Sequence, residues 1–288
     1  MAGLDMTTVS AADPTASESS EYVDPDWIVV LPRRKKRKVH PKICPPEEEE
    51  QKPWAPPDTK IDSAKESKLL QNMQTCLKKL ENSKFYDLFL NQIQDPKIST
   101  CFTQVLGSEP KMNMVIYGIG SIESFEPPRL QLSLAILMKR RFDWIGDIEV
   151  FDPVLSATET KVLESLGCSV MSMNEQGRRE ALKPILFFMP HCEAVLYHNL
   201  LETNWDVTKL RNMALFGNSF ESYEHHASVV KDYIASPYTK RILTARNFTD
   251  EFRIPTGPDD HCKAFHESSW HFFSPDSEEA LHTVLGVN

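Results

Sequence analysis

Glycine is scarce in this sequence, whose 288 residues contain only 10 glycines, about half the usual share. This scarcity excludes collagen-like and glycine-serine linker architectures. It also makes each glycine informative, because a chain that rarely uses glycine places it where the backbone geometry requires it. Long apolar runs are missing too: none reaches the ~18 residues of a membrane-spanning helix. The first residues lack the charged and apolar regions of a secretory signal.

The six cysteines show neither a C-x-x-C pair nor the tight spacing of a disulfide framework. Without a secretory signal, this pattern indicates reduced thiols, and we expect an intracellular protein. The positions are Cys44, Cys76, Cys101, Cys168, Cys192 and Cys262.

Charge is unevenly distributed along the chain. Residues 1–60 contain 9 basic and 11 acidic groups, and residues 61–288 contain 23 and 30, so the second part has a net charge of −7. Nucleic-acid binding needs a basic face that neutralises phosphates, so we expect no direct nucleic-acid binding.

Residues 1–60 are predicted to form a disordered head. They hold nine of the 20 prolines and few apolar residues, so folding would not bury enough surface to offset the lost conformational entropy. The exception is the apolar run Trp27–Leu31. It is either a partner-binding motif or a strand that lies on the chain's own domain.

A run of six consecutive cations follows Pro32 in this head. Import receptors bind dense cationic segments of flexible regions, so the run predicts access to the nucleus through an import receptor. It consists of Arg33, Arg34, Lys35, Lys36, Arg37 and Lys38.

Apolar residues recur at helical spacing after residue 60, and a second short helix is expected around Phe85. We therefore predict that residues 61–111 form a helical segment packed on the core. The recurring residues of the first helix are Leu69, Met73, Cys76 and Leu80.

Short apolar runs alternate with helical patterns from residue 112 to residue 254. This alternation predicts an α/β fold with a doubly wound, mostly parallel sheet. Residues 255–288 are expected to be a carboxyl-terminal extension with an edge strand at Trp270–Phe273. The predicted strands are 114–119, 147–152, 168–173, 184–189, 213–217 and 241–245, and the predicted helices are 128–141, 156–167, 192–202 and 226–235.

Ligands of such sheets bind outside the carboxyl ends of the strands. The residues at and just after the carboxyl end of each predicted strand therefore form a candidate ligand-binding edge. They are Gly118, Gly120, Ser121, Asp152, His191, Cys192, Gly217, Asn218 and Ser219.

Gly118 and Gly120 follow the first strand, and Asp152 ends the next one. Dinucleotide-binding sheets use these positions for the pyrophosphate and the ribose. However, Glu123 replaces the third glycine of that fingerprint, and Glu123 and Glu126 would repel a pyrophosphate. A nucleotide or S-adenosylmethionine-type ligand and a purely structural turn are both open at this point.

His191 and Cys192 form the most reactive-looking pair, because a helix N-terminus lowers the pKa of a cysteine in its first turn. No third group that would orient them is evident. The alternative is a histidine with satisfied hydrogen bonds near a helix N-terminus, beside a cysteine that is packed in the interior. Haem ligation by this pair is a weaker alternative, since no c-type attachment motif is present.

Other histidines do not form a standard motif. The spacing of His261, Cys262, His266 and His271 matches no zinc finger, and His225 with His226 opens a predicted helix. We therefore predict neither a metal site nor a catalytic residue set.

The chain resembles the Sensitivity to Red Light Reduced family in MVIYGIGSIESFEPPRLQLSLAILM, IEVFDPVLSATETKVLESLGC, LFFMPHCEAVLYHNLLETNW and MALFGNSFESY. The segments DWIVVLPRRKKRK and SWHFFS are similar to its plant members. The resemblance covers roughly residues 20 to 275.

This resemblance implies a Rossmann-like domain and a regulatory role in phytochrome (red-light) signalling and circadian clock input. It also implies a protein of the nucleus and cytoplasm, with signalling or clock proteins as partners. No catalytic residues are established for the family, so none is carried over. The family motif positions include Gly118, Gly120, Asp152, His191 and Gly217.

Two functions are therefore considered. The first is a non-enzymatic signalling regulator. The alternative is a ligand sensor or cryptic enzyme that binds a nucleotide, S-adenosylmethionine or a haem-related metabolite at the strand edge.

Changing Arg33–Lys38 to alanine is expected to abolish nuclear enrichment of the tagged protein, because the import receptor would lose its cationic ligand. Confocal imaging of the nuclear-to-cytoplasmic ratio measures this. A variant in which lysine and arginine are exchanged within the run keeps the charge and should remain nuclear. An unchanged distribution of the alanine variant would refute the import role.

Overall fold

The structure is a computed structural model that describes residues 53–229, 236–255, 260–278 and 281. These residues belong to a compact unit that begins at Glu50. The predictions for the head, including Trp27–Leu31 and Arg33–Lys38, lie outside the described residues. The side chains of His261 and Cys262 also lie outside them.

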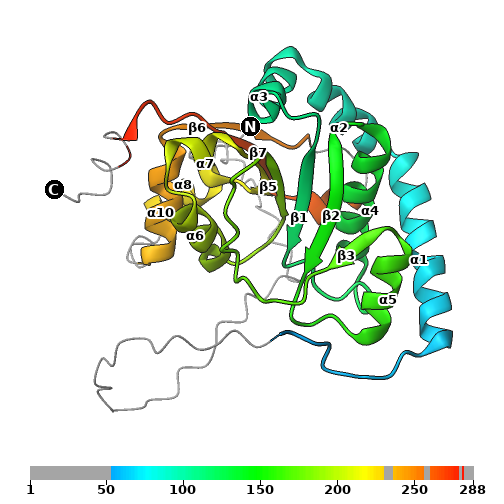
Figure 1. Cartoon of the computed structure of the whole chain (residues 1–288). Helices are drawn as coiled ribbons and strands as arrows, with labels where there is room; N and C mark the ends of the chain where they lie inside the picture. Colours follow the sequence, from blue (N-terminus) through cyan, green and yellow to red (C-terminus); the bar gives the residue numbers. More distant parts are fainter. Residues whose placement is uncertain (1–52, 230–235, 256–259, 279–280, 282–288) are drawn as a thin grey trace, which may run out of the picture. The chain divides into compact units, whose positions relative to one another are not determined.

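A seven-stranded mixed sheet forms the centre of this unit (Figure 1). Its strands are β1 Met112–Tyr117, β2 Ile145–Phe151, β3 Cys168–Val170, β4 Ile185–Met189, β5 Met213–Asn218, β6 Thr249–Arg253 and β7 Ser268–Phe273. The order is β3-β2-β1-β4-β5-β7-β6, with β7 antiparallel to both of its neighbours and the first five strands parallel. The predicted doubly wound, mostly parallel α/β fold is confirmed.

Helices pack on both faces of the sheet (Figure 1). One face carries α1 Ser63–Glu81, α2 Lys84–Gln94, α3 Pro96–Leu106, α4 Glu126–Arg141, α5 Ala157–Ser165 and the 3-10 turn Asp260–Phe265. The other face carries α6 Ala194–Thr203, α7 Val207–Arg211, α8 Phe220–Val229 and α10 Pro237–Arg246. Among the described residues, no helix combines the length and the apolar character that a membrane crossing requires.

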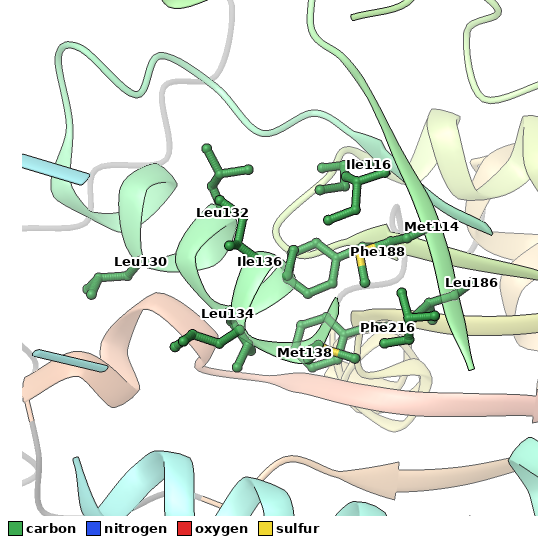
Figure 2. Packing of buried hydrophobic residues seen from close by; sticks show 14 of the residues in the cluster. Met114, Ile116, Leu130, Leu132, Leu134, Ile136, Met138, Leu186, Phe188 and Phe216 are labelled. Atoms are coloured by element: carbon green, nitrogen blue, oxygen red, sulfur yellow. The ribbon is translucent and has the colours of Figure 1, made fainter. Parts of the chain in front are cut away.

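Helix α4 is buried on every side, since every residue from Leu130 to Met138 is inaccessible to solvent or nearly so. Figure 2 shows its side chains beside Ile116 of β1, Phe188 of β4 and Phe216 of β5. A helix without a polar face needs cover all round. Helix α1 supplies that cover on the side away from the sheet.

Local signals set several helix ends. Ser156 and Glu159 form the capping box that starts α5, and Gly167 follows the end of this helix with a φ of 84°. The cap of α1 is Asp62, whose carboxylate accepts hydrogen bonds from the backbone N–H groups of Ala64 and Lys65. An aspartate before Ser63 satisfies the free N–H groups of the first turn as well as a serine would.

Near the carboxyl terminus, one predicted element is wrong, and two others have the predicted type but differ in their start or in their place in the sheet. Residues 241–245 lie inside α10, where Ile242 and Ala245 face the core at helical spacing. The predicted helix 226–235 begins earlier, since α8 starts at Phe220. The run Trp270–Phe273 belongs to β7, which lies inside the sheet rather than at its edge and is buried along its whole length. Short apolar runs do not by themselves distinguish helix from strand or edge from interior.

Among the described residues, contacts with the sheet begin at Trp54, before residue 61, where the folded part was predicted to start. The backbone N–H of Trp54 donates to the carbonyl of Ser172 at 2.6 Å, and its ring meets Phe151 edge-on with centroids 5.3 Å apart. The backbone N–H of Ala157 donates to Asp58 at 2.6 Å.

His271 of β7 is fully buried. Its Nδ1 lies 3.3 Å from the carbonyl of Leu215, its ring packs on Phe220 with centroids 4.1 Å apart, and its Nε2 lies 3.7 Å from Glu251 on β6. Burial lowers the pKa of His271 strongly, and the nearby Glu251 opposes this shift only in part. The imidazole is therefore neutral in the folded protein.

Lowering the pH below about 6.5, the pKa of a histidine in an unfolded chain, is expected to destabilise the protein. The unfolded state then binds a proton at His271 and the folded state does not, so the free energy of unfolding falls by up to about 1.4 kcal/mol per pH unit below 6.5, until the folded pKa of about 4 is reached. Urea denaturation at pH 7 and pH 5 measures the change. The substitution His271→Asn should flatten this dependence, and His225→Asn at an exposed position should not. Equal slopes for all three proteins would contradict the assignment.

Candidate functional site

The carboxyl ends of β2, β1, β4 and β5 lie next to one another at one edge of the sheet, as the parallel registers require. The candidate residues therefore share an edge. Their side chains, however, do not converge on one cleft. They form two clusters, one after β1 and β2 and one after β4 and β5.

In the first cluster, Asp152 binds the backbone of the chain itself. Its Oδ2 accepts a hydrogen bond from the N–H of Gly120 at 2.7 Å, and its Oδ1 accepts one from the N–H of Val154 at 3.0 Å. Gly118 and Gly120 have φ values of 66° and 73°, a region that favours glycine. The backbone N–H of Gly120, which would donate to a phosphate in a dinucleotide-binding sheet, is thus already bonded to the Asp152 carboxylate.

The loop after Gly120 is held closed by Glu159, a buried residue of α5. Glu159 Oε1 accepts hydrogen bonds from the Ser121 hydroxyl at 2.8 Å and from the backbone N–H of Glu123 at 2.9 Å. Ile119 and Ile122 are buried in the core below the loop. The sequence signals the capping role of Glu159, but not this second contact 36 residues away.

These contacts do not fit a nucleotide or S-adenosylmethionine site of the dinucleotide-binding kind. Such a site needs free backbone donors at the glycine turn and a carboxylate that is free to bind a ribose. Here Gly120 and Asp152 bond to each other. The geometry favours the purely structural turn, one of the two alternatives that the sequence leaves open.

Cys192 is buried and precedes Glu193, the cap residue of α6, so it lies outside the first turn of that helix. Its thiol donates to the carbonyl of Tyr117 at 3.1 Å, and a Cβ on Gly118 would lie 2.6 Å from its Sγ. Burial, with smaller contributions from Asp152 and Glu193, raises the pKa of Cys192 far above its usual range. The geometry therefore supports neither a nucleophilic thiolate nor a thiolate ligand of haem.

His191 lies in a strained left-handed conformation, with a φ of 58°. Its backbone N–H donates to Asn218 Oδ1 at 2.7 Å, while Asn218 Nδ2 donates to the carbonyl of Cys192 at 3.0 Å. The His191 Nε2 lies 3.1 Å from the carbonyl of Ala264. Desolvation, opposed by this contact, lowers the pKa of His191. Asn218 thus acts as a clamp on the turn after β4.

Tyr197 of α6 completes this clamp, and no sequence motif points to it. Its hydroxyl donates to the carbonyl of Met189 and accepts the backbone N–H of Asn218 at 2.8 Å. A Cβ at position 217 would lie 2.7 Å from this hydroxyl, so the close approach requires glycine there. A buried tyrosine needs a hydrogen-bond partner for its hydroxyl. A tyrosine on the apolar side of α6 is therefore the only kind of sequence signal that could have pointed to this contact.

A small polar pocket of about 130 Å³ lies beside the second cluster. It is smaller than the ~300 Å³ of the smallest typical ligand pockets. Among the residues that the structure describes, no group of three or more metal-binding side chains is arranged to hold an ion; His266 lines the pocket, whereas His271 is buried in the sheet. The pocket residues are His191, Asn218, Ser219, Ser222, Tyr223, His226, His266 and Glu267.

A family model described as the SRR1 domain matches residues 65–272. The Arabidopsis thaliana protein SENSITIVITY TO RED LIGHT REDUCED 1 is 56% identical over 272 residues, which cover 93% of this chain and 98% of that protein. An SRR1-like protein of Mus musculus is 32% identical over 219 residues, which cover 69% of this chain and 86% of that protein.

Two solved structures share a distant likeness with this chain. The 23S rRNA methyltransferase ErmE has a TM-score of 0.32 at 10% identity, covering 64% of this chain and 69% of that one. The plantazolicin methyltransferase BpumL has a TM-score of 0.29 at 11% identity, and the likeness covers 74% of this chain and 100% of that one. Scores this low carry no argument about a ligand or an activity.

Replacing Asp152 with asparagine is expected to reduce the free energy of unfolding by about 1–3 kcal/mol, because one partly buried backbone N–H loses its charged acceptor. Urea denaturation measures this change. The control Asp143→Asn alters an exposed carboxylate and should stay within about 0.5 kcal/mol of the parent. A fully stable Asp152→Asn protein that loses a thermal shift with S-adenosylmethionine would instead return Asp152 to a ligand-binding role.

Proposed function

Because this chain belongs to the SRR1 domain family, we propose that it is a regulatory protein of the plant red-light response. The observation that carries this proposal is the 56% identity to the Arabidopsis protein named for red-light sensitivity. That alignment spans nearly the whole of both chains. The shared function therefore concerns the complete folded unit rather than one motif within it.

On this proposal the protein acts by binding partners rather than by catalysis. The arrangement of the strand edge supports this choice. Asp152, Cys192 and Asn218, which looked available for chemistry, each bind backbone groups of the chain itself. Hydrogen bonds of this kind hold a surface in one shape, which is what a binding module requires.

The finer parts of the proposal are input to the circadian clock and residence in both nucleus and cytoplasm. The basic run Arg33–Lys38 supports nuclear entry through an import receptor. Signalling or clock proteins are the proposed partners. The excess of 30 acidic over 23 basic groups in residues 61–288 argues against direct nucleic-acid binding.

Complementation tests the function. An Arabidopsis line without its own SENSITIVITY TO RED LIGHT REDUCED 1 protein receives this chain, and hypocotyl length is measured over a series of red-light intensities. We expect the normal red-light response to return, and the period of clock-controlled luciferase expression tests the clock component in the same plants.

The control is a Gly118→Leu variant, which places a side chain against Cys192 and strains a left-handed backbone. It should accumulate poorly and fail to complement. A parent chain that is well expressed and folded, yet leaves hypocotyl length unchanged, would refute the proposed function.

A further inference from the structure

Strand β6 forms one end of the seven-stranded sheet, and among the described residues only β7 pairs with it (Figure 1). It has five residues, whereas β3 at the other end has three. Its register with β7 runs without a bulge, and its sequence, TDEFR, contains no proline. Bulges and prolines are devices that keep an edge strand from pairing with a further strand. The edge of β6 is therefore open to such pairing.

The backbone groups that β6 turns outward follow from its pairing with β7. The N–H of Ile254, directly after β6, donates to the carbonyl of the first residue of β7 at 2.9 Å, and bonded positions alternate along an antiparallel ladder. Thr249, Glu251 and Arg253 therefore turn their N–H and carbonyl groups away from β7. Within the described part of the chain, only the Arg253 carbonyl has a partner on that side, the side-chain amide of Gln92 at 2.5 Å. A carbonyl oxygen has two lone pairs, so it can accept a second bond.

The side chains of the same three residues line a groove along this edge. Residues of α8 and α10 form its other wall, and the enclosed volume is about 350 Å³. The lining residues are Glu221, Arg246, Asn247, Thr249, Glu251 and Arg253.

The Glu251 carboxylate in this groove lacks a donor. Its side chain is only 12% exposed, and its Oε1 accepts no hydrogen bond from any residue that the structure describes. The Nε2 of His271 lies 3.7 Å away. Because Nδ1 of this neutral imidazole faces the carbonyl of Leu215, Nε2 is itself an acceptor. A mostly buried acceptor without a donor is unusual, so the groove lacks a donor that another chain can supply.

A second copy of β6 complements this edge in one register. Antiparallel pairing about a two-fold axis places one residue opposite its own copy and pairs the neighbours of that residue crosswise. With Phe252 on the axis, Glu251 lies opposite Arg253 of the partner subunit, and the reciprocal pair forms as well. With Asp250, Glu251 or Arg253 on the axis, a charge meets an equal charge, which destabilises a sheet. Only the register centred on Phe252 pairs opposite charges.

We propose that the protein forms a dimer through its β6 edges, with the two strands antiparallel and Phe252 on the two-fold axis. Directly opposite side chains have Cβ atoms about 4.5–5.5 Å apart, so each Arg253 guanidinium reaches Glu251 of the other subunit and supplies the missing donor. The two Phe252 rings meet on the other face of the sheet, where each already packs against Phe272 with centroids 6.1 Å apart. This dimer does not depend on the red-light function.

The groups that would form the interface are available at little cost. Arg253 binds Glu221 of its own subunit at 3.0 Å, but both side chains are more than half exposed, and exposed ion pairs contribute little to stability. The backbone groups of Glu251 and Arg253 exchange hydrogen bonds across the axis as in any antiparallel ladder. Two strands of this length form a small interface, so we expect weak, concentration-dependent association.

Sedimentation velocity of the full chain, from about 1 µM to about 500 µM, tests the proposal. We expect the sedimentation coefficient to rise with concentration from the value of a monomer towards that of a dimer. A chain that stays monomeric over the whole range overturns the proposal and leaves the edge to a strand of another protein.

Exchange of charges locates the interface. The substitution Arg253→Glu should weaken dimerisation at least about tenfold, because each Glu251 then faces a carboxylate. Adding Glu251→Arg reverses both pairs and should restore the dimer. The control Arg140→Glu makes the same change of charge at an exposed position of α4 and should leave dimerisation unchanged. If Arg253→Glu weakens the dimer no more than Arg140→Glu does, the proposal is overturned.

Amide hydrogen exchange of the unmodified chain gives a second readout that does not require the double variant to fold. The N–H groups of Glu251 and Arg253 should exchange more slowly in concentrated than in dilute samples, because they gain acceptors in the dimer. Those of Asp250 and Phe252 already bond to β7 and should change less. A sample that sediments as a dimer without slower exchange at Glu251 and Arg253 has its interface elsewhere, which would overturn the proposal.

Discussion

The burial of α4 on all sides is the constraint on which the rest of the described unit depends. A nine-residue stretch without an exposed side chain cannot face water, so it needs the sheet on one side and α1 on the other. The helices before β1 therefore form a layer of the core rather than an appendage. That layer makes one face of the sheet thick and strongly apolar, and it leaves the other face to fewer helices.

At the carboxyl edge, the chain supplies its own hydrogen-bond partners where other doubly wound sheets receive a ligand. Asp152 and Glu159 hold the loop after β1, and Asn218 and Tyr197 hold the turn after β4. Each of them links segments that are distant in sequence. The left-handed turns at Gly118, Gly120 and His191 are stable because these contacts over-determine them. The result is an edge whose conformation is fixed by contacts within the chain itself.

Particular residues show how far sequence reasoning reached. The capping box of α5, the glycine after it and the runs of β1, β2, β4 and β5 were readable, because caps, turns and short apolar runs are local signals. The run 241–245 is predicted as a strand but lies in α10, since its apolar residues suit either element. The interior position of β7 was also missed, because pairing between distant strands leaves no local pattern. The candidate residues were placed at the correct edge, but the direction of each side chain was not predictable.

The sequence by itself determined the fold class, the position of the strand ends and the family, because periodicity, glycine placement and motif identity are properties of short segments. Only the tertiary structure decided what those strand ends do. Whether Asp152 faces a ligand or the N–H of Gly120, and whether Cys192 is exposed or packed against Gly118, depends on contacts between segments far apart in the chain.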